Sequence, residues 1–237
     1  MIGRAVLAAA YASVFFTGVA FASSAHIVNI AVKENYSMLT ASVNLEGAFT
    51  EEIKEAFKSG MPVTFTFLVN VVRSRPFFWD AGEKSIRLHK IVKYDSFAKE
   101  YNAIDVIAPQ PPAPGDFEKL LESIKKDNGD TLFSEQPAKP GLLKRRHLVL
   151  KDLSTVEYWM SRLRGIPLGN TVDYPADKKY YLQVKAEMDT IKLTPPFNYI
   201  FFFVSFLNFD TDWETSSPFI IKQYNPPINN MVVLQDK

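Results

Sequence analysis

Apolar and polar residues alternate with a period of two through residues 63–72, and this is the clearest pattern in the chain. Such alternation predicts a β-strand that turns one face to the core. The residues on that face are Val63, Phe65, Phe67, Val69 and Val71.

Other short runs rich in β-branched and aromatic residues predict strands at 27–32, 36–45, 85–94, 100–107, 147–150 and 179–189. The expected turns between neighbouring runs are Glu34-Asn35 and Asp95-Ser96. Strands that follow one another this closely usually pair antiparallel. We therefore expect an antiparallel, β-rich core, built as a sheet or a sandwich.

Two or three helices are expected around this core, from three candidate stretches. Thr50 is a suitable N-cap for the first, which Gly60 and Pro62 end, and its predicted buried residues are Ile53, Ala56 and Phe57. The second covers residues 116–126, with an inward face of Phe117, Leu120, Leu121 and Ile124. The third begins at Asp152 or Ser154 and runs to about Arg164, with Val156, Trp159, Met160 and Leu163 at helical spacing.

Prolines are concentrated in residues 108–115, a stretch that reads Ala-Pro-Gln-Pro-Pro-Ala-Pro-Gly. Proline lacks a backbone N–H and fixes φ, so this stretch cannot lie inside a helix or a central strand. We expect residues 108–143 to form a surface excursion. The rest of residues 23–237 then makes a single α+β domain with two or three packed helices.

The N-terminal 22 residues are typical of a signal peptide. Arg4 precedes an uncharged apolar run, which ends in the small-x-small sequence Ala20-Phe21-Ala22. Cleavage after Ala22 would remove one arginine and no acid, leaving a formally neutral, exported mature chain. The alternative is retention of the segment as an N-terminal anchor.

A second apolar block covers residues 197–207 and follows a double proline. It is shorter than the roughly 20 residues that a helix needs to cross a bilayer. We expect a buried strand or core helix, and no membrane span once the signal segment is cleaved.

Composition excludes several chemistries. The chain of 237 residues has no cysteine, so disulfides, cysteine-based zinc or iron–sulfur sites and thiol nucleophiles are absent. The formal net charge of +1 argues against a nucleic-acid partner, since such proteins are usually strongly basic.

Three stretches together resemble a known family. They are Leu-Glu-Gly-Ala-Phe-Thr-Glu-Glu-Ile at 45–53 with 60–65, Val-Lys-Tyr-Asp-Ser-Phe-Ala-Lys-Glu-Tyr at 92–101, and Tyr-Tyr-Leu-Gln-Val-Lys-Ala-Glu at 180–187 with 195–213. Their order and spacing are similar to those of the domain-of-unknown-function 4390 family of exported bacterial proteins. The resemblance covers most of residues 28–220.

This resemblance implies an exported envelope protein without an assigned activity. It also implies a partner in the envelope, with a sensor histidine kinase as the candidate, because genes of relatives lie near those of such kinases. No catalytic residue can be carried over, since the family has no accepted catalytic motif.

Candidate catalytic and metal-binding groups are few. His26, His89 and His147 form no pair with metal-ligand spacing, and we expect a structural role for His89. Ser96 with Lys99 and Ser123 with Lys126 have the Ser-x-x-Lys spacing, but the other motifs of that catalytic class are missing.

Two charged clusters allow two interpretations each. Asp210, Asp212 and Glu214 alternate, so they would either bind a hard cation such as calcium or form a solvated strand edge. The run 144–147, with Arg162 and Arg164, would either meet an anionic partner or form a solvated face. The solvated interpretation is favoured for both, and we expect no metal and no cofactor.

Basic and aromatic residues lie together in the connecting segment 73–80. Arginine and large aromatic residues are enriched at interaction surfaces, and the candidate contact residues are Arg73, Arg75, Phe77, Phe78 and Trp79. The alternative is that the aromatic side chains cap the core.

The sequence thus favours a periplasmic or otherwise exported interaction module, linked to envelope signalling, that binds an envelope protein and catalyses no reaction. The alternative is a hydrolase, or a lipid or glycan carrier, whose site is scattered through the sequence.

Overall fold

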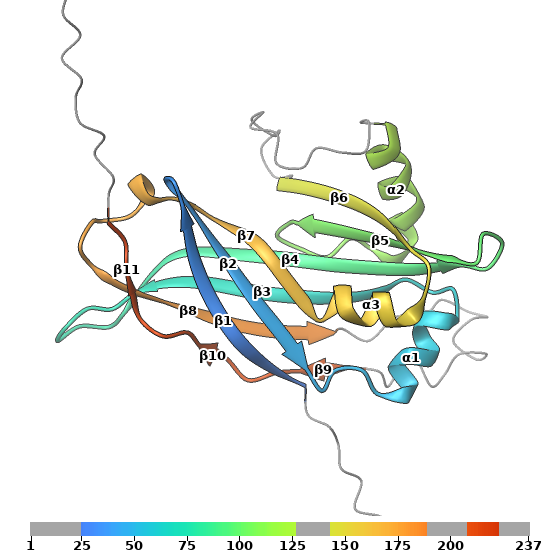
Figure 1. Ribbon diagram of the computed structural model, residues 1–237, viewed down its shortest axis with the longest axis horizontal. Coiled ribbons are helices and arrows are strands. Elements are labelled where there is room, and N and C mark those ends of the chain that lie inside the picture. Colours follow the sequence, from blue (N-terminus) through green and yellow to red (C-terminus); the bar gives the residue numbers. More distant parts are fainter. Residues whose placement is uncertain (1–24, 127–142, 189–207, 223–237) are drawn as a thin grey trace, which may run out of the picture.

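The structure, a computed structural model, describes residues 25–126, 143–188 and 208–222. Within these residues the chain forms two antiparallel β-sheets and three α-helices (Figure 1). This confirms the expected β-rich α+β fold. The signal-peptide segment 1–22 and the apolar block 197–207 lie outside the described residues.

The smaller sheet has the strand order β1-β2-β7, with β1 at His26–Asn35, β2 at Met38–Glu46 and β7 at Arg162–Asn170. The expected turn at Glu34-Asn35 is wrong, because both residues continue β1 and pair with Leu39 and Met38 of β2. The hairpin instead turns at Tyr36, whose φ of 56° is left-handed, as tight two-residue hairpin turns require.

The larger sheet runs in the order β10-β8-β3-β4-β5-β6, and β9 and β11 also pair with β8. Its long strands are β3 (Val63–Arg73), β4 (Ala81–Asp95), β5 (Glu100–Ile107), β6 (Leu143–Leu150) and β8 (Lys179–Met188). The short ones are β9 (Phe209–Asp210), β10 (Glu214–Thr215) and β11 (Phe219–Ile220). All of its pairings are antiparallel. This was expected for strands consecutive in the chain, such as β3–β4, β4–β5 and β5–β6, and it also holds for β3–β8.

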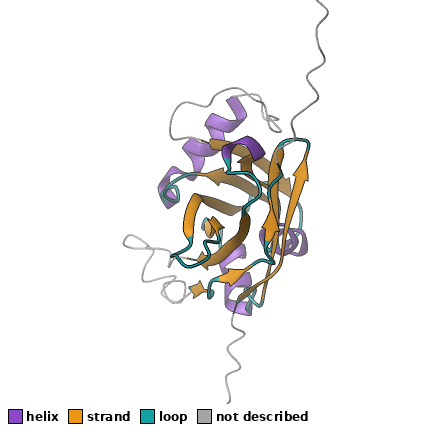
Figure 2. Ribbon diagram, turned by 90° about the vertical axis from the view of Figure 1, so that its left-hand side faces the viewer, coloured by secondary structure: helices purple, strands orange, loops and turns teal. Residues whose placement is uncertain are grey.

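The main core lies between the two sheets. The smaller sheet crosses diagonally over one face of the larger one, and Figure 2 shows the same layers from the end of the molecule. The predicted inner face of β3 is confirmed, since Val63, Phe65, Phe67, Val69 and Val71 have no exposed surface. Leu39, Ala41 and Val43 of β2 meet them in one hydrophobic cluster.

Helix α1 (Glu51–Lys58) is confirmed as predicted. The Thr50 side chain accepts the N–H of Ile53 and caps the helix. Ile53, Ala56 and Phe57 are its buried residues, and they close one end of the inter-sheet core.

Helix α3 (Leu153–Met160) has the expected N-cap at Asp152, but the expected end near Arg164 is wrong. The helix stops at Met160, and residues 162–170 form β7, a strand that the helical spacing concealed. Gly165, with a φ of 65°, and Pro167 disfavour a helix here. Leu163 is buried as expected, but on the strand.

Helix α2 (Phe117–Lys126) follows a single 3-10 turn, η1 (Pro114–Asp116), and covers the opposite face of the larger sheet. Phe117 and Ile124 are buried there against Ile91, Ile104 and Val106, and Leu120 and Leu121 pack partly against them. The predicted inward face of this helix is therefore confirmed. Among the described residues, none of the helices has the length and apolarity to span a bilayer.

Candidate interaction site

The β3–β4 hairpin ends in a projecting tip, residues 73–80, which is the leftmost described part of the ribbon in Figure 1. Phe77, Phe78 and Trp79 are 101%, 78% and 93% exposed. They therefore do not cap the core, which was the alternative interpretation of these residues. A contiguous group of large exposed apolar side chains is unusual for a protein surface, where such residues are normally scattered.

Asp80 fixes the shape of the tip. Its carboxylate accepts a hydrogen bond from the Tyr181 hydroxyl at 2.6 Å and another from the Arg75 N–H at 3.0 Å. The Tyr181 bond, followed by the Arg75 N–H bond, lowers the pKa of Asp80, so the carboxylate is ionised at neutral pH. The same bond to Asp80 raises the pKa of Tyr181 to about 12, which keeps the hydroxyl protonated as the donor.

An ion pair and a backbone hydrogen bond hold the base of the tip to the neighbouring strands. Arg73 Nε lies 2.7 Å from Glu83 Oε1, which joins the last residue of β3 to the start of β4. The Ser74 N–H donates to the Lys179 carbonyl at 2.9 Å, which joins the tip to β8. Arg75 remains exposed within the tip.

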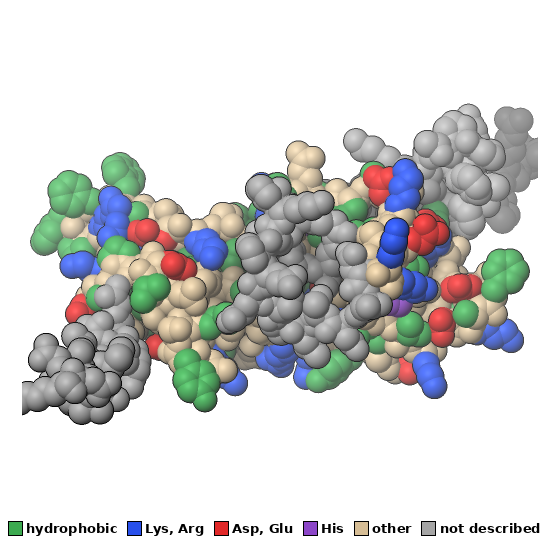
Figure 3. All heavy atoms as spheres, turned by 90° about the horizontal axis from the view of Figure 1, so that it is seen from above, with side chains coloured by type: hydrophobic (Ala, Val, Ile, Leu, Met, Phe, Trp, Pro, Cys, Tyr) green, Lys and Arg blue, Asp and Glu red, His purple; other side chains and the backbone are tan. Residues whose placement is uncertain are grey.

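Basic residues lie at the same end of the molecule as the exposed rings. Lys178 and Lys179 are exposed next to the strand that receives Ser74. Hydrophobic, basic and some acidic side chains gather at the left end of Figure 3, the end that carries the tip in Figure 1. Asp80 and Asp177 are the nearby exposed carboxylates.

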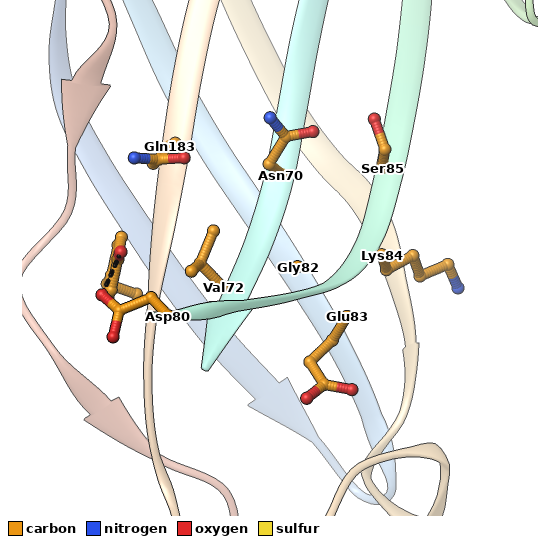
Figure 4. A pocket seen from close by; sticks show the side chains of 9 residues that line it. Asn70, Val72, Asp80, Gly82, Glu83, Lys84, Ser85 and Gln183 are labelled. Atoms are coloured by element: carbon orange, nitrogen blue, oxygen red, sulfur yellow. Dashed lines mark hydrogen bonds between the residues drawn. The ribbon is translucent and has the colours of Figure 1, made fainter. Parts of the chain in front are cut away.

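An open polar hollow of about 560 Å³ adjoins the base of the tip (Figure 4). Gln183, Asn70 and Ser85 form a row across β8, β3 and β4, since Asn70 pairs with both of the others in the sheet. The remaining lining residues are Val72, Asp80, Gly82, Glu83, Lys84 and Tyr181. None of the described residues that line this hollow is a histidine, so no Ser-His pair is assembled around Ser85 there.

The histidines occupy separate places. His89 is fully buried, and both ring nitrogens have hydrogen-bond partners. Nδ1 lies 2.9 Å from the Thr66 hydroxyl, and Nε2 donates to the Ala108 carbonyl. His147 bonds to Asn102, and burial lowers its pKa. His26 lies 3.9 Å from Glu46 on the smaller sheet.

The structure brings no acidic or histidine group together as a metal site within the described residues. Asp210 instead pairs with Lys185, at 2.7 Å, across the β8–β9 ladder. Asp212 and Glu214 are exposed. This arrangement fits the solvated-edge interpretation of the acidic triplet.

The two Ser-x-x-Lys pairs are not assembled as catalytic groups. Ser96 lies in the β4–β5 turn, and the Ser123 hydroxyl donates to the Leu120 carbonyl within α2. In the basic run, Arg146 makes two hydrogen bonds to Asp105, and Arg162 stacks over the Tyr158 ring at 4.2 Å. Arg164 is exposed on β7.

The sequence interpretation missed a buried charged cluster. Lys90 is 2% exposed, donates to the carbonyls of Trp159 and Arg162 at 2.7 and 3.0 Å, and lies over the Trp159 ring. Its Nζ is 3.8 Å from Asp105, which also binds Arg146. Burial, only partly offset by Asp105, lowers the pKa of Lys90 to about 8. The sequence does contain one sign of this cluster. Lys90 interrupts a row of alternate apolar residues on β4 that face the core, namely Ile86, Leu88 and Val92.

Residues 22–217 match a family described as Domain of unknown function (DUF4390). The chain belongs to the DUF4390 family. This confirms the resemblance drawn from its three sequence stretches, and the family description assigns no activity or site residue. No curated protein and no solved structure matches the chain.

Proposed function

We propose that this DUF4390 protein is an exported, non-catalytic interaction module of the cell envelope and that the hairpin tip is its contact surface. The observation that carries the proposal is the exposure of Phe77, Phe78 and Trp79, at 78% or more, on one projecting loop. Arg75 beside them adds the other residue type that dominates binding surfaces.

The stiffness of the tip supports the same function. Binding costs less when the contact residues are already ordered. Asp80 holds Tyr181 and the Arg75 N–H together, and the Ser74 N–H donates to Lys179, so the loop that carries the rings is tied to β8 at two points. A tip of this kind presents its aromatic side chains without first having to fold.

The envelope location rests on the sequence. The signal-peptide pattern at residues 1–22 supports export, and a cysteine-free chain suits an oxidising compartment because no thiol is left unpaired. We propose the periplasm as the compartment. The partner implied by the family resemblance is an envelope protein, and a sensor histidine kinase is the first candidate.

A hydrolase is less well supported. Ser85 lines the hollow without a histidine, and the described histidines lie apart from it. For a lipid or glycan carrier we would expect a deep aromatic pocket. The open hollow beside the tip is instead lined mainly by polar and charged side chains.

The test is photo-cross-linking in the native envelope. A benzoylphenylalanine in place of Phe78 should give cross-linked products with envelope components. The matched control carries the same group in place of Phe97, which is 99% exposed in the β4–β5 turn. Products that require position 78 support the proposal; folded protein that gives none, or the same products from both positions, contradicts it.

A further inference from the structure

We infer that the tip makes its first contact with the lipid bilayer, by inserting Phe77, Phe78 and Trp79 into the membrane interface. This inference rests on the proposed function, because it names the envelope component that the same tip meets. The domain would then bind a protein partner after the tip has attached it to the membrane surface.

The shape of the tip favours a bilayer. It is a convex projection whose rings point into solvent, with exposures of 101%, 78% and 93%. A bilayer accepts such a projection without a preformed pocket. Aromatic residues are enriched at membrane interfaces, where the indole of Trp matches both the apolar and the polar side.

The backbone of the tip suits a medium with little water. Unpaired N–H groups are costly in lipid. The Ser74 N–H donates to the Lys179 carbonyl, and the Phe78 N–H donates to the Arg75 carbonyl. The Arg75 N–H donates to the Asp80 carboxylate. Pro76 has no N–H to satisfy. Three N–H groups of the tip are thus paired within the protein before insertion.

The charges around the tip agree with an anionic lipid surface. Arg75, Lys178 and Lys179 are exposed basic residues in the tip or next to it in the sheet, and Asp80 and Asp177 are exposed carboxylates there. Arg73 is already paired with Glu83. These five exposed side chains carry a net charge of only +1, so we expect apolar insertion to dominate and headgroup attraction to be secondary.

The opposite end of the larger sheet carries a single exposed aromatic ring, in contrast to the three rings of the tip. Phe97 is 99% exposed in the β4–β5 turn, but its neighbours there are the polar and charged residues Asp95, Ser96 and Lys99. A single exposed ring is ordinary for a soluble surface. Position 97 is therefore a control for non-specific adsorption.

The experiment places a tryptophan reporter at either end. Exported protein, purified with its native N-terminus, is mixed with vesicles of phosphatidylethanolamine and phosphatidylglycerol that contain brominated lipid. Bromine quenches only tryptophan within the bilayer, so the readout is local and does not depend on the N-terminal segment. All variants share the background emission of Trp159 and Trp213, and the difference between wild type and Trp79→Phe reports on position 79. The variants are wild type, Trp79→Phe, and Trp79→Phe with Phe97→Trp.

We expect a blue shift and quenching of tryptophan emission in the wild type, loss of both in Trp79→Phe, and no recovery with the reporter at position 97. Replacing Phe78 and Trp79 by Ala should weaken vesicle binding about tenfold or more, because both rings leave the interface. Phosphatidylcholine vesicles should bind several-fold less, because they offer the basic side chains no net negative headgroup charge.

Three results would separate the two proposals. If tryptophan at position 97 is quenched as strongly as tryptophan at position 79, the protein adsorbs to vesicles non-specifically, and the inference is overturned. Unquenched Trp79, together with cross-linking of position 78 to a protein, overturns the membrane contact but leaves the interaction module standing. Unquenched Trp79 with no cross-linked product at position 78 contradicts both.

Discussion

At the scale of single residues, Lys90 is the least expected feature of the molecule. A lysine that is 2% exposed in an apolar row needs partners, and it finds two carbonyls, an indole ring and a carboxylate. These contacts tie the end of α3 and the start of β7 to β4. The cluster therefore joins the two sheets by polar contacts inside a hydrophobic core.

Lys90 makes the stability of the protein depend on pH in the alkaline range. Its pKa falls from 10.5 to about 8 on folding, so between these values the unfolded chain binds more protons than the folded protein. The free energy of unfolding should therefore rise with pH in this window, by about 1 kcal/mol between about pH 8 and pH 9. Urea denaturation followed by circular dichroism measures it.

The control is Lys90→Met, which keeps an apolar chain of similar length and removes the titrating group. This variant should lose the rise between pH 8 and 9, whatever its overall stability. Measurements stop at pH 9 because tyrosines with raised pKa values, such as Tyr174, titrate only at higher pH. An equal rise in both proteins would mean that Lys90 is not the group responsible.

Individual residues differ in how far the sequence reveals them. Thr50 and Asp152 are found as caps because capping depends on nearby backbone N–H groups. Lys90 and Asp105 are not, because their partners come from distant β7, α3 and β6. Nothing local distinguishes a charged residue held in this way from one at the surface.

At the scale of elements, a long alternation of apolar and polar residues identifies a strand. A spacing of apolar residues that suits both a helix and a strand does not. The ten-residue alternation in β3 has one interpretation, whereas Leu163 lies four residues after Trp159 and suits either a longer helix or the next strand. Pairing with β2 decides it, through contacts such as Val43 with Leu163. The tip residues were identified from composition, but only the structure shows that their rings point away from the core.

The hairpin tip should loosen when one of its two links to β8 is removed. Tyr181→Phe deletes the hydroxyl that donates to Asp80, so the carboxylate loses one of its two bonds. We expect hydrogen exchange of the Arg75 N–H to accelerate by about tenfold, while the unfolding midpoint changes little. Hydrogen exchange followed by NMR measures both.

Tyr36→Phe is the matched control, because Tyr36 is 92% exposed in a different hairpin turn. It should leave exchange at Arg75 unchanged. The same loosening should weaken binding by the tip, since more order must then be gained on contact. Unaltered exchange in Tyr181→Phe would show that Ser74 and the Arg73–Glu83 pair suffice to hold the tip.

At the scale of the whole molecule, the larger sheet has two apolar faces of unequal size. One is covered by the smaller sheet, α1 and α3, and includes Phe65, Phe67 and most of the other buried residues. The other is a small cluster in which Phe117 and Ile124 of α2 meet three strand residues. This difference predicts two levels of stability within one domain.

Phe67→Ala should lower the free energy of unfolding of the whole protein by about 3–5 kcal/mol, because the ring is fully buried between the sheets. Phe117→Ala should instead release α2 from the sheet, with faster hydrogen exchange in residues 117–126 and a global transition shifted by less than about 1 kcal/mol. Parallel denaturation and exchange experiments compare them. Equal global shifts for the two variants would mean that both faces unfold as a single cooperative unit, and that α2 is as integral to the fold as the inter-sheet core.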